Sequence, residues 1–164
     1  NMHIPPAVPM AGTKKLHLRK ARIEDMASIE IIERESFPDP WNQETFLEAL
    51  ALYPSTCFIA EDDGRIVGFI AAGIENTGVE QYGHIMNLAV SPEHRHRGIG
   101  RMLVRQIEQA CMLEGATAVS LEVRETNTIA RAFYHRLGYR QVLRIAEYYA
   151  NGETAAVMMK WYRI

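Results

Sequence analysis

An apolar strand leads through a basic turn into a helix in the stretch Asn87-Leu88-Ala89-Val90-Ser91-Pro92-Glu93-His94-Arg95-His96-Arg97-Gly98-Ile99-Gly100. The first backbone N–H groups of a helix have no intrahelical partner, and the helix dipole adds partial positive charge there. Gly98 and Gly100 leave room for close approach, and glycine tolerates backbone angles that other residues resist. Arg95, Arg97 and Arg101 add formal charge at the same place. The stretch therefore predicts a phosphate-binding site, which a pyrophosphate would suit.

Spacing separates this motif from two other nucleotide-binding motifs. A Walker loop needs Gly-x-x-x-x-Gly-Lys-Ser/Thr, and no Lys-Ser or Lys-Thr pair occurs here. A dinucleotide fingerprint needs Gly-x-Gly-x-x-Gly, and Leu103 stands at its last position. The pattern Arg95-x-x-Gly98-x-Gly100 instead resembles the acetyl-CoA signature of the GCN5-related N-acetyltransferases (GNAT). This resemblance implies acetyl-CoA as cofactor and places His96 and Ile99 in the cofactor-binding loop; the alternative is a basic helix start on a solvated surface.

Hydrophobic periodicity on both sides of this stretch predicts a mixture of strands and helices. Strands are expected at 15–21, 56–60, 65–74, 82–90, 117–123, 139–149 and 154–162. Helices are expected from Glu24 or Asp25 to about 37, from 42 through 50, from 99 to a left-handed cap at Gly115, and from Thr126 or Asn127 to 137. The unit from 82 to 123 has the length of a right-handed crossover, so its strands should be parallel. The expected fold is α/β (α+β), with a mixed, mostly antiparallel sheet of about seven strands and helices on both faces.

Length and composition restrict the class of protein. A chain of 164 residues fits one domain. The segment 1–14 is interpreted as a flexible arm in which Asn1 before Met2 is an expression scar, leaving 15–164 as the domain. A net charge of −2 argues against general nucleic-acid binding. Without a transmembrane-length apolar run or a signal-peptide pattern, we expect a cytoplasmic protein with no membrane partner, as a monomer or weak homodimer.

The element order resembles the GNAT fold over nearly the whole chain from Lys15 onward. Four blocks resemble the RimI-type protein N-terminal acetyltransferases and their archaeal and eukaryotic relatives: Phe37-Pro38-Asp39-Pro40-Trp41, Leu121-Glu122-Val123-Arg124-Glu125-Thr126-Asn127, Phe133-Tyr134 with Leu137-Gly138-Tyr139, and Tyr148-Tyr149. The resemblance implies a splayed parallel pair at strands four and five. It also implies an enzyme that moves an acetyl group from acetyl-CoA to a protein α-amine, in bacterial RimI relatives that of a ribosomal protein.

Two residues are candidates for the base that deprotonates the acceptor amine. Glu122 interrupts an apolar strand that should be covered on both faces, where a carboxylate is costly unless it is partnered or useful. The resemblance also places the RimI-type base on Glu122; the alternative is a structural ion pair with an arginine such as Arg95 or Arg124. His84 is the competitor, because histidine needs little tuning to act as a base near neutral pH. A lone histidine in a strand is otherwise a half-buried structural residue.

The remaining cofactor contacts follow from the resemblance. Tyr134 stands where the family keeps a tyrosine that faces the CoA sulfur, and Asn127 stands where relatives hydrogen-bond the cofactor; the alternatives are a packing aromatic and a simple N-cap. Leu88, Ala89 and Val90 would offer backbone amides to the pantetheine at a splayed, bulged strand. Phe133 should face the core.

The acceptor side is expected between two loops. Phe37 and Trp41 would form one wall, and Tyr148 and Tyr149 the other, and Asn87 is counted with the acceptor side. The Asn87 side chain would either fix the strand distortion or satisfy a buried backbone group. Aromatics in loops can equally cover the core. Neither Cys57 nor Cys111 lies in a block expected to meet the thioester, and neither has metal-like spacing, so we expect direct attack in a ternary complex and no metal. The alternatives are a lysine or polyamine acetyltransferase and a non-catalytic acyl-CoA-binding module.

Overall fold

The computed structural model describes residues 16–162, so the expected arm at 1–14 and the first strand residue, Lys15, lie outside the described part. The strands are β1 (Leu16–Lys20), β2 (Cys57–Asp62), β3 (Arg65–Asn76), β4 (Gln81–Val90), β5 (Ala118–Arg124), β6 (Arg140–Ile145) and β7 (Ala155–Trp161). The α-helices are α1 (Met26–Ser36), α2 (Gln43–Leu52), α3 (Ile99–Leu113) and α4 (Thr128–Arg136). Short 3-10 turns lie at Ile23–Asp25, Pro54–Thr56 and Pro92–His94.

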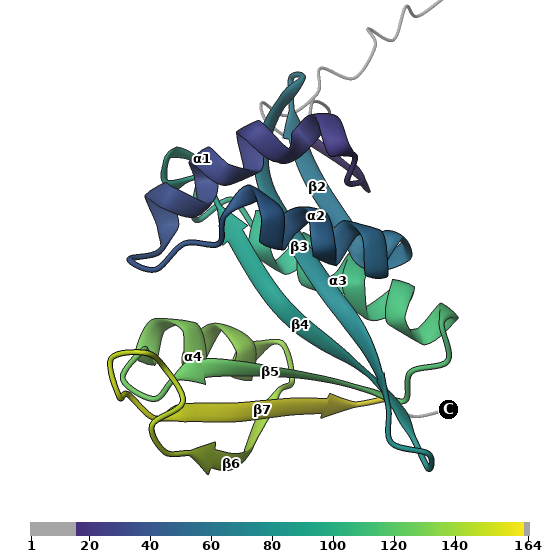
Figure 1. Ribbon diagram of the computed structural model, residues 1–164, viewed down its shortest axis with the longest axis vertical. Helices are drawn as coiled ribbons and strands as arrows, with labels where there is room; N and C mark the ends of the chain where they lie inside the picture. The colour runs from purple at the N-terminus through teal and green to yellow at the C-terminus, as the bar shows by residue number, and fades with distance from the viewer. Residues whose placement is uncertain (1–15, 163–164) are drawn as a thin grey trace, which may run out of the picture.

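The seven strands form one sheet in the order β1-β2-β3-β4-β5-β7-β6 (Figure 1). All neighbouring pairs are antiparallel except β4 and β5, which are parallel. The expected mixed sheet and its parallel crossover are thus confirmed. No described helix is both long and apolar enough to span a membrane.

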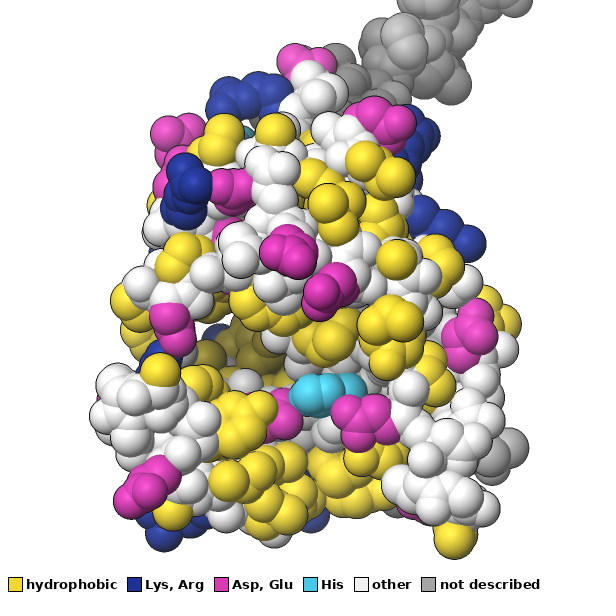
Figure 2. Space-filling view, in the orientation of Figure 1, with side chains coloured by type: hydrophobic (Ala, Val, Ile, Leu, Met, Phe, Trp, Pro, Cys, Tyr) yellow, Lys and Arg dark blue, Asp and Glu magenta, His cyan; other side chains and the backbone are white. Residues whose placement is uncertain are grey.

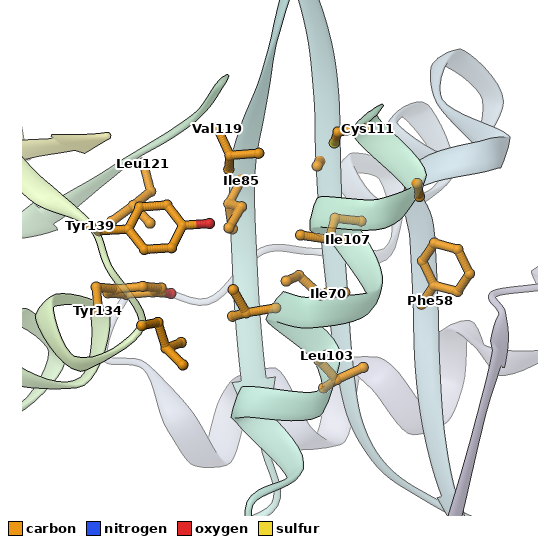
Figure 3. Close-up of a cluster of buried hydrophobic side chains, with 14 of the residues drawn as sticks. Phe58, Ile70, Ile85, Leu103, Ile107, Cys111, Val119, Leu121, Tyr134 and Tyr139 are labelled. Carbon is orange, nitrogen blue, oxygen red and sulfur yellow. The ribbon is translucent and has the colours of Figure 1, made fainter. Parts of the chain in front are cut away.

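Two hydrophobic cores cover opposite faces of the sheet. Along β2, Phe58 and Ala60 belong to one core, and Cys57 and Ile59 belong to the other, as the two-residue period of a strand requires. Figure 3 shows the first core, in which α3 packs on the sheet and α4 extends the contact to β5. The second core lies beneath α1 and α2. Cys57 and Cys111 are both buried, and burial raises the pKa of the Cys57 thiol to about 11 and that of the Cys111 thiol to about 12.

The strand expected at 139–149 is shorter than the sequence pattern indicated. β6 ends at Ile145, and Glu147 takes a positive φ of 52°. The backbone N–H groups of Tyr148 and Tyr149 both donate to the carbonyl of Glu153. A compact turn therefore replaces the end of the predicted strand, because this local pairing competes with the ladder to β7.

Gly83 lies where the two halves of the sheet meet, opposite Val119 of β5. A Cβ atom at Gly83 would lie 2.5 Å from Cys111 Sγ. We expect Gly83→Ala to lower the free energy of unfolding by about 1–3 kcal/mol through overpacking. In a Cys111→Ala background Gly83→Ala should lower the free energy of unfolding by less. Urea unfolding of the wild type, the two single variants and the double variant would measure this difference. Equal losses in both backgrounds would contradict this contact.

Candidate active site

A cleft opens between β4 and β5. Their register is limited to Tyr82 with Ala118, Gly83 with Val119 and His84 with Ser120, and the strands diverge beyond it (Figure 1). A cavity of about 290 Å³ lies in this opening, and Figure 2 shows the hollow between the two halves of the molecule. Its walls come from α1 with the loop that follows it, from β4 and β5, from the start of α4, and from Tyr149.

A β-bulge shapes the β4 wall of the cleft. Asn87 pairs with Ala71 and Ile85 with Ala72, which leaves Met86 as the extra residue. The Asn87 side chain donates to Glu33 Oε1 of α1 at 2.8 Å. Asn87 therefore fastens the bulge to α1, one of the two roles the sequence left open for it. The bulge precedes Leu88, Ala89 and Val90, whose strand has no register partner on the β5 side.

The basic turn surrounds an open helix N-terminus. His96 and Gly98 have positive φ angles of 65° and 80°, and α3 begins at the buried residue Ile99. Arg95 donates to Val90 O at 3.3 Å and to Ser36 Oγ at 3.4 Å, while Arg97 lies 3.9 Å from Asp62. Arg101 is exposed on the first turn of the helix. The predicted charge and the free backbone donors thus coincide.

The two glycines of the turn have different structural reasons. A Cβ atom at Gly98 would meet nothing within 4 Å. The positive φ of Gly98 and the space that a bound ligand needs are therefore the two reasons for glycine here. A Cβ atom at Gly100 would lie 3.3 Å from the Phe133 ring, so Gly100 also allows α4 to pack against α3. Phe133 is half-buried at this contact, and its packing agrees with the expected orientation toward the core.

The two candidate bases are direct partners, although the sequence presented them as competitors. His84 Nε2 lies 2.6 Å from Glu122 Oε2, and His84 Nδ1 lies 3.1 Å from Glu75 Oε1. The hydrogen bond with Glu122 raises the pKa of His84, burial opposes this rise, and the charges of Glu122 and Glu75 add to it. The Tyr148 hydroxyl donates to Glu122 Oε1 at 3.4 Å. No arginine pairs with Glu122 among residues 16–162, so the ion-pair alternative with Arg95 or Arg124 is wrong.

Tyr134 and Asn127 reach the cleft from α4. Tyr134 lines the cavity although it is buried, and burial raises the pKa of its hydroxyl far above the ordinary value. Asn127 Oδ1 accepts from the N–H of Ala130 at 3.0 Å, so it is the N-cap of α4. Asn127 also lines the cavity. Its side-chain oxygen is already used by the cap, so its amide nitrogen is the group that could contact a ligand.

The two expected acceptor walls meet at Arg124. Its guanidinium lies 3.2 Å from Asp39 in the loop after α1 and 2.5 Å from Glu153, and it stacks 4.1 Å above the Tyr149 ring. Phe37 and Trp41 line the cavity on the α1 side, and Tyr149 lines it on the other. Tyr148 is exposed and contacts the site through Glu122.

Sequence reasoning missed two carboxylates, Glu75 and Glu33. Glu75 of β3 contacts His84 because the turn at Asn76 to Gly78 folds β4 back beside β3. Glu33 is 1% exposed and accepts from the Trp41 N–H and from Asn87, both at Oε1, while Oε2 has no partner in the described part of the chain. A glutamate four residues after buried Ile29 on the apolar stripe of α1 was the signal available for Glu33.

Burial raises the pKa of Glu33, and nearby Asp39 adds to the rise. Between the ordinary value of 4.5 and the raised value, the folded state keeps a proton that the unfolded state releases. The Glu33 contribution to the free energy of unfolding should therefore fall as pH rises through this window. We expect Glu33→Gln to flatten this dependence in urea titrations between pH 4.5 and 8, and the exposed Glu35→Gln on the same helix to leave it unchanged. Parallel curves for wild type and Glu33→Gln would contradict the assignment.

The fold places the start of α3, bordered by arginines, beside the opening between β4 and β5. Residues 26–139 match the model of the Acetyltransferase (GNAT) family, and the chain belongs to that family. It is 36% identical over 155 residues to an N-alpha-acetyltransferase of Sulfurisphaera tokodaii, covering 88% of this chain and 92% of the relative. It is 32% identical to a putative [ribosomal protein bS18]-alanine N-acetyltransferase of Bacillus subtilis, covering 88% and 94%.

Solved structures have the same fold. Ard1 from Thermoplasma volcanium superposes with a TM-score of 0.85 at 23% identity, covering 92% of this chain and 99% of that one. Chaetomium thermophilum Naa20 in complex with a bisubstrate analogue gives a TM-score of 0.82 at 31% identity, covering 88% and 86%.

Proposed function

We propose that this chain uses acetyl-CoA to acetylate the N-terminal α-amine of a protein, by direct attack in a ternary complex. The observation that carries the proposal is the Glu122–His84 pair, 2.6 Å apart, at the cleft of a GNAT-family fold. The N-alpha-acetyltransferase relatives support the choice of an α-amine as acceptor. The Bacillus subtilis relative makes a ribosomal protein in the cytoplasm a candidate acceptor.

The residues present fit acetyl-CoA. The open space at Gly98, the free N–H groups at the start of α3 and the neighbouring arginines suit a pyrophosphate. The unpaired side of β4 at Leu88 to Val90 offers backbone groups to an extended pantetheine arm. When bound, acetyl-CoA supplies an activated acetyl group on a thioester whose sulfur can leave as a thiolate.

Proton transfer falls to Glu122 and His84. An α-amine has an ordinary pKa of about 7.7–8 and a lysine of about 10.4, so an α-ammonium needs only a modest base. Glu122, directly or through one water, can receive the proton while its partner His84 stabilises the charge. This assignment treats the two residues as one unit.

Tyr134 is the group proposed to donate a hydrogen bond to the departing thiolate. Burial raises the pKa of its hydroxyl, so the hydroxyl keeps its proton at neutral pH. It has no hydrogen-bond partner among residues 16–162, which leaves it free to donate into the cavity it lines. Neither cysteine lines this cavity, so a covalent acetyl-cysteine route has no nucleophile here.

Thiol release with acetyl-CoA and short peptides tests the proposal. The peptides should differ at their first two residues, and each should be supplied with a free and a blocked N-terminus. Release that requires a free N-terminus is the expected result. Release from blocked lysine-containing peptides or polyamines would move the reaction to other amines, and no release with any acceptor would favour a binding module.

A further inference from the structure

Glu75, His84 and Glu122 form a row across three neighbouring strands. His84 faces Gly73 on β3 and Ser120 on β5, so Glu75 and Glu122 each stand two residues beyond the direct register partner. A two-residue step keeps a side chain on the same face of a sheet, which explains why all three meet. Their side chains are 45%, 23% and 20% exposed in that order, so the row runs from solvent toward the cleft.

We propose that Glu75 is a positioning residue for the α-amine acetylation, holding the His84 ring at Nδ1 so that Nε2 faces Glu122. The proposal rests on the proposed function. Glu75 lies 3.1 Å from Nδ1 and Glu122 lies 2.6 Å from Nε2.

The chemistry follows from the two nitrogens of the ring. A neutral imidazole carries one N–H, and a carboxylate can only accept a hydrogen bond. Glu75 at Nδ1 and Glu122 at Nε2 therefore compete for that one proton, and Glu75 shifts the balance toward the tautomer with the proton on Nδ1. When the acceptor ammonium gives up a proton, directly or through one water, its N–H bond breaks and an O–H bond forms on Glu122. Glu122 can then pass a proton to Nε2, 2.6 Å away, so that an N–H bond forms there and the Glu122 carboxylate is restored. The imidazolium that results lies between two carboxylates, and each of them stabilises it.

Other titratable groups face this row from each packed element. The Tyr82 hydroxyl of β4 hydrogen-bonds Glu75, which raises the pKa of that tyrosine. The Tyr148 hydroxyl, from the turn after β6, donates to Glu122. The acid limb of the pH–rate profile should therefore follow the titration of His84. Because both carboxylates raise the pKa of His84, the midpoint of this limb should lie above the ordinary histidine pKa of 6.5.

Two measurements on the full chain test the role of Glu75. Long-range ¹H–¹⁵N spectra would follow the tautomer and titration of His84 from pH 5 to 9, with its signals among the six histidines assigned by the His84→Gln variant. In Glu75→Gln we expect a smaller Nδ1–H population and a His84 pKa lower by about 0.5–1 unit. The acid limb of kcat/KM should move to lower pH by the same amount, and the plateau kcat should fall about three- to tenfold.

Glu80→Gln, in the nearby turn between β3 and β4, is the matched control and should change neither readout. An unchanged tautomer and titration of His84 in Glu75→Gln would overturn the proposal. An altered spectrum with an unaltered rate profile would overturn its catalytic part. Failure of the wild type to acetylate any α-amine is seen before a variant is made and overturns the proposed function itself.

Discussion

Replacing Glu122 by Gln should lower kcat by about 10²- to 10⁴-fold while the affinity for acetyl-CoA stays nearly unchanged. Gln keeps the size of the side chain but cannot take the proton that the acceptor ammonium releases. The loss should be greatest at low pH, where most of the acceptor is protonated, and smaller at high pH, where free amine is already present. Thiol release across pH 6 to 9, combined with calorimetric titration of acetyl-CoA, would measure both quantities.

Glu125→Gln is the matched control for this prediction. Glu125 follows β5 directly, but it pairs with exposed Arg144 outside the cleft, and that pairing lowers the pKa of Glu125. Unaltered turnover and pH profile in Glu122→Gln would place the base elsewhere, with His84 next in line. His84→Gln should show the same kind of loss if the pair acts as one unit, and losses of the double variant should be far from additive.

A bulky residue in place of Gly98 should weaken acetyl-CoA binding at least tenfold. Its effect on kcat at saturating acetyl-CoA should be smaller. Gly98→Val adds a side chain at the helix terminus where the backbone donors are free, in a positive-φ conformation that a β-branched residue resists. Gly100 is the poorer test, because its substitution would also disturb Phe133. Calorimetric titration of acetyl-CoA and CoA would measure the change.

Gly64→Val supplies the control for backbone strain. Gly64 has a φ of 79°, against 80° for Gly98, and a Cβ atom at either glycine would meet nothing within 4 Å. The strain of the two substitutions should therefore be similar, while only Gly98→Val should lose affinity. Unchanged acetyl-CoA affinity in a folded Gly98→Val protein would refute the pyrophosphate site.

The sheet and its helices could be predicted because their signals are local. The apolar stripe of α3 and the turns at Asp63-Gly64 and Gly115 fix element type and order without knowledge of the rest of the chain. The end of β6 could not be predicted in this way, because aromatic residues there favour a strand until the turn to Glu153 competes for their N–H groups.

The sequence could single out Glu122 and His84 as candidates, but it could not show that they are in contact. Glu122 stood out as a carboxylate in an apolar strand and His84 as a histidine in another, yet their contact depends on the parallel register of β4 and β5. Glu75 has no unusual local context, since a glutamate at the end of an exposed strand is ordinary. Only the three-dimensional register shows that it contacts the same imidazole ring.

Burial of the two cysteines has a practical consequence for work with this protein. With thiol pKa values of about 11 and 12, Cys57 and Cys111 hold roughly 0.1% thiolate or less near pH 8. Disulfide dyes and mild oxidants attack the thiolate, so both side chains should resist them while the fold is intact. A dye-based assay can therefore assign its signal to free coenzyme A, and a sudden rise in protein-bound label would report unfolding.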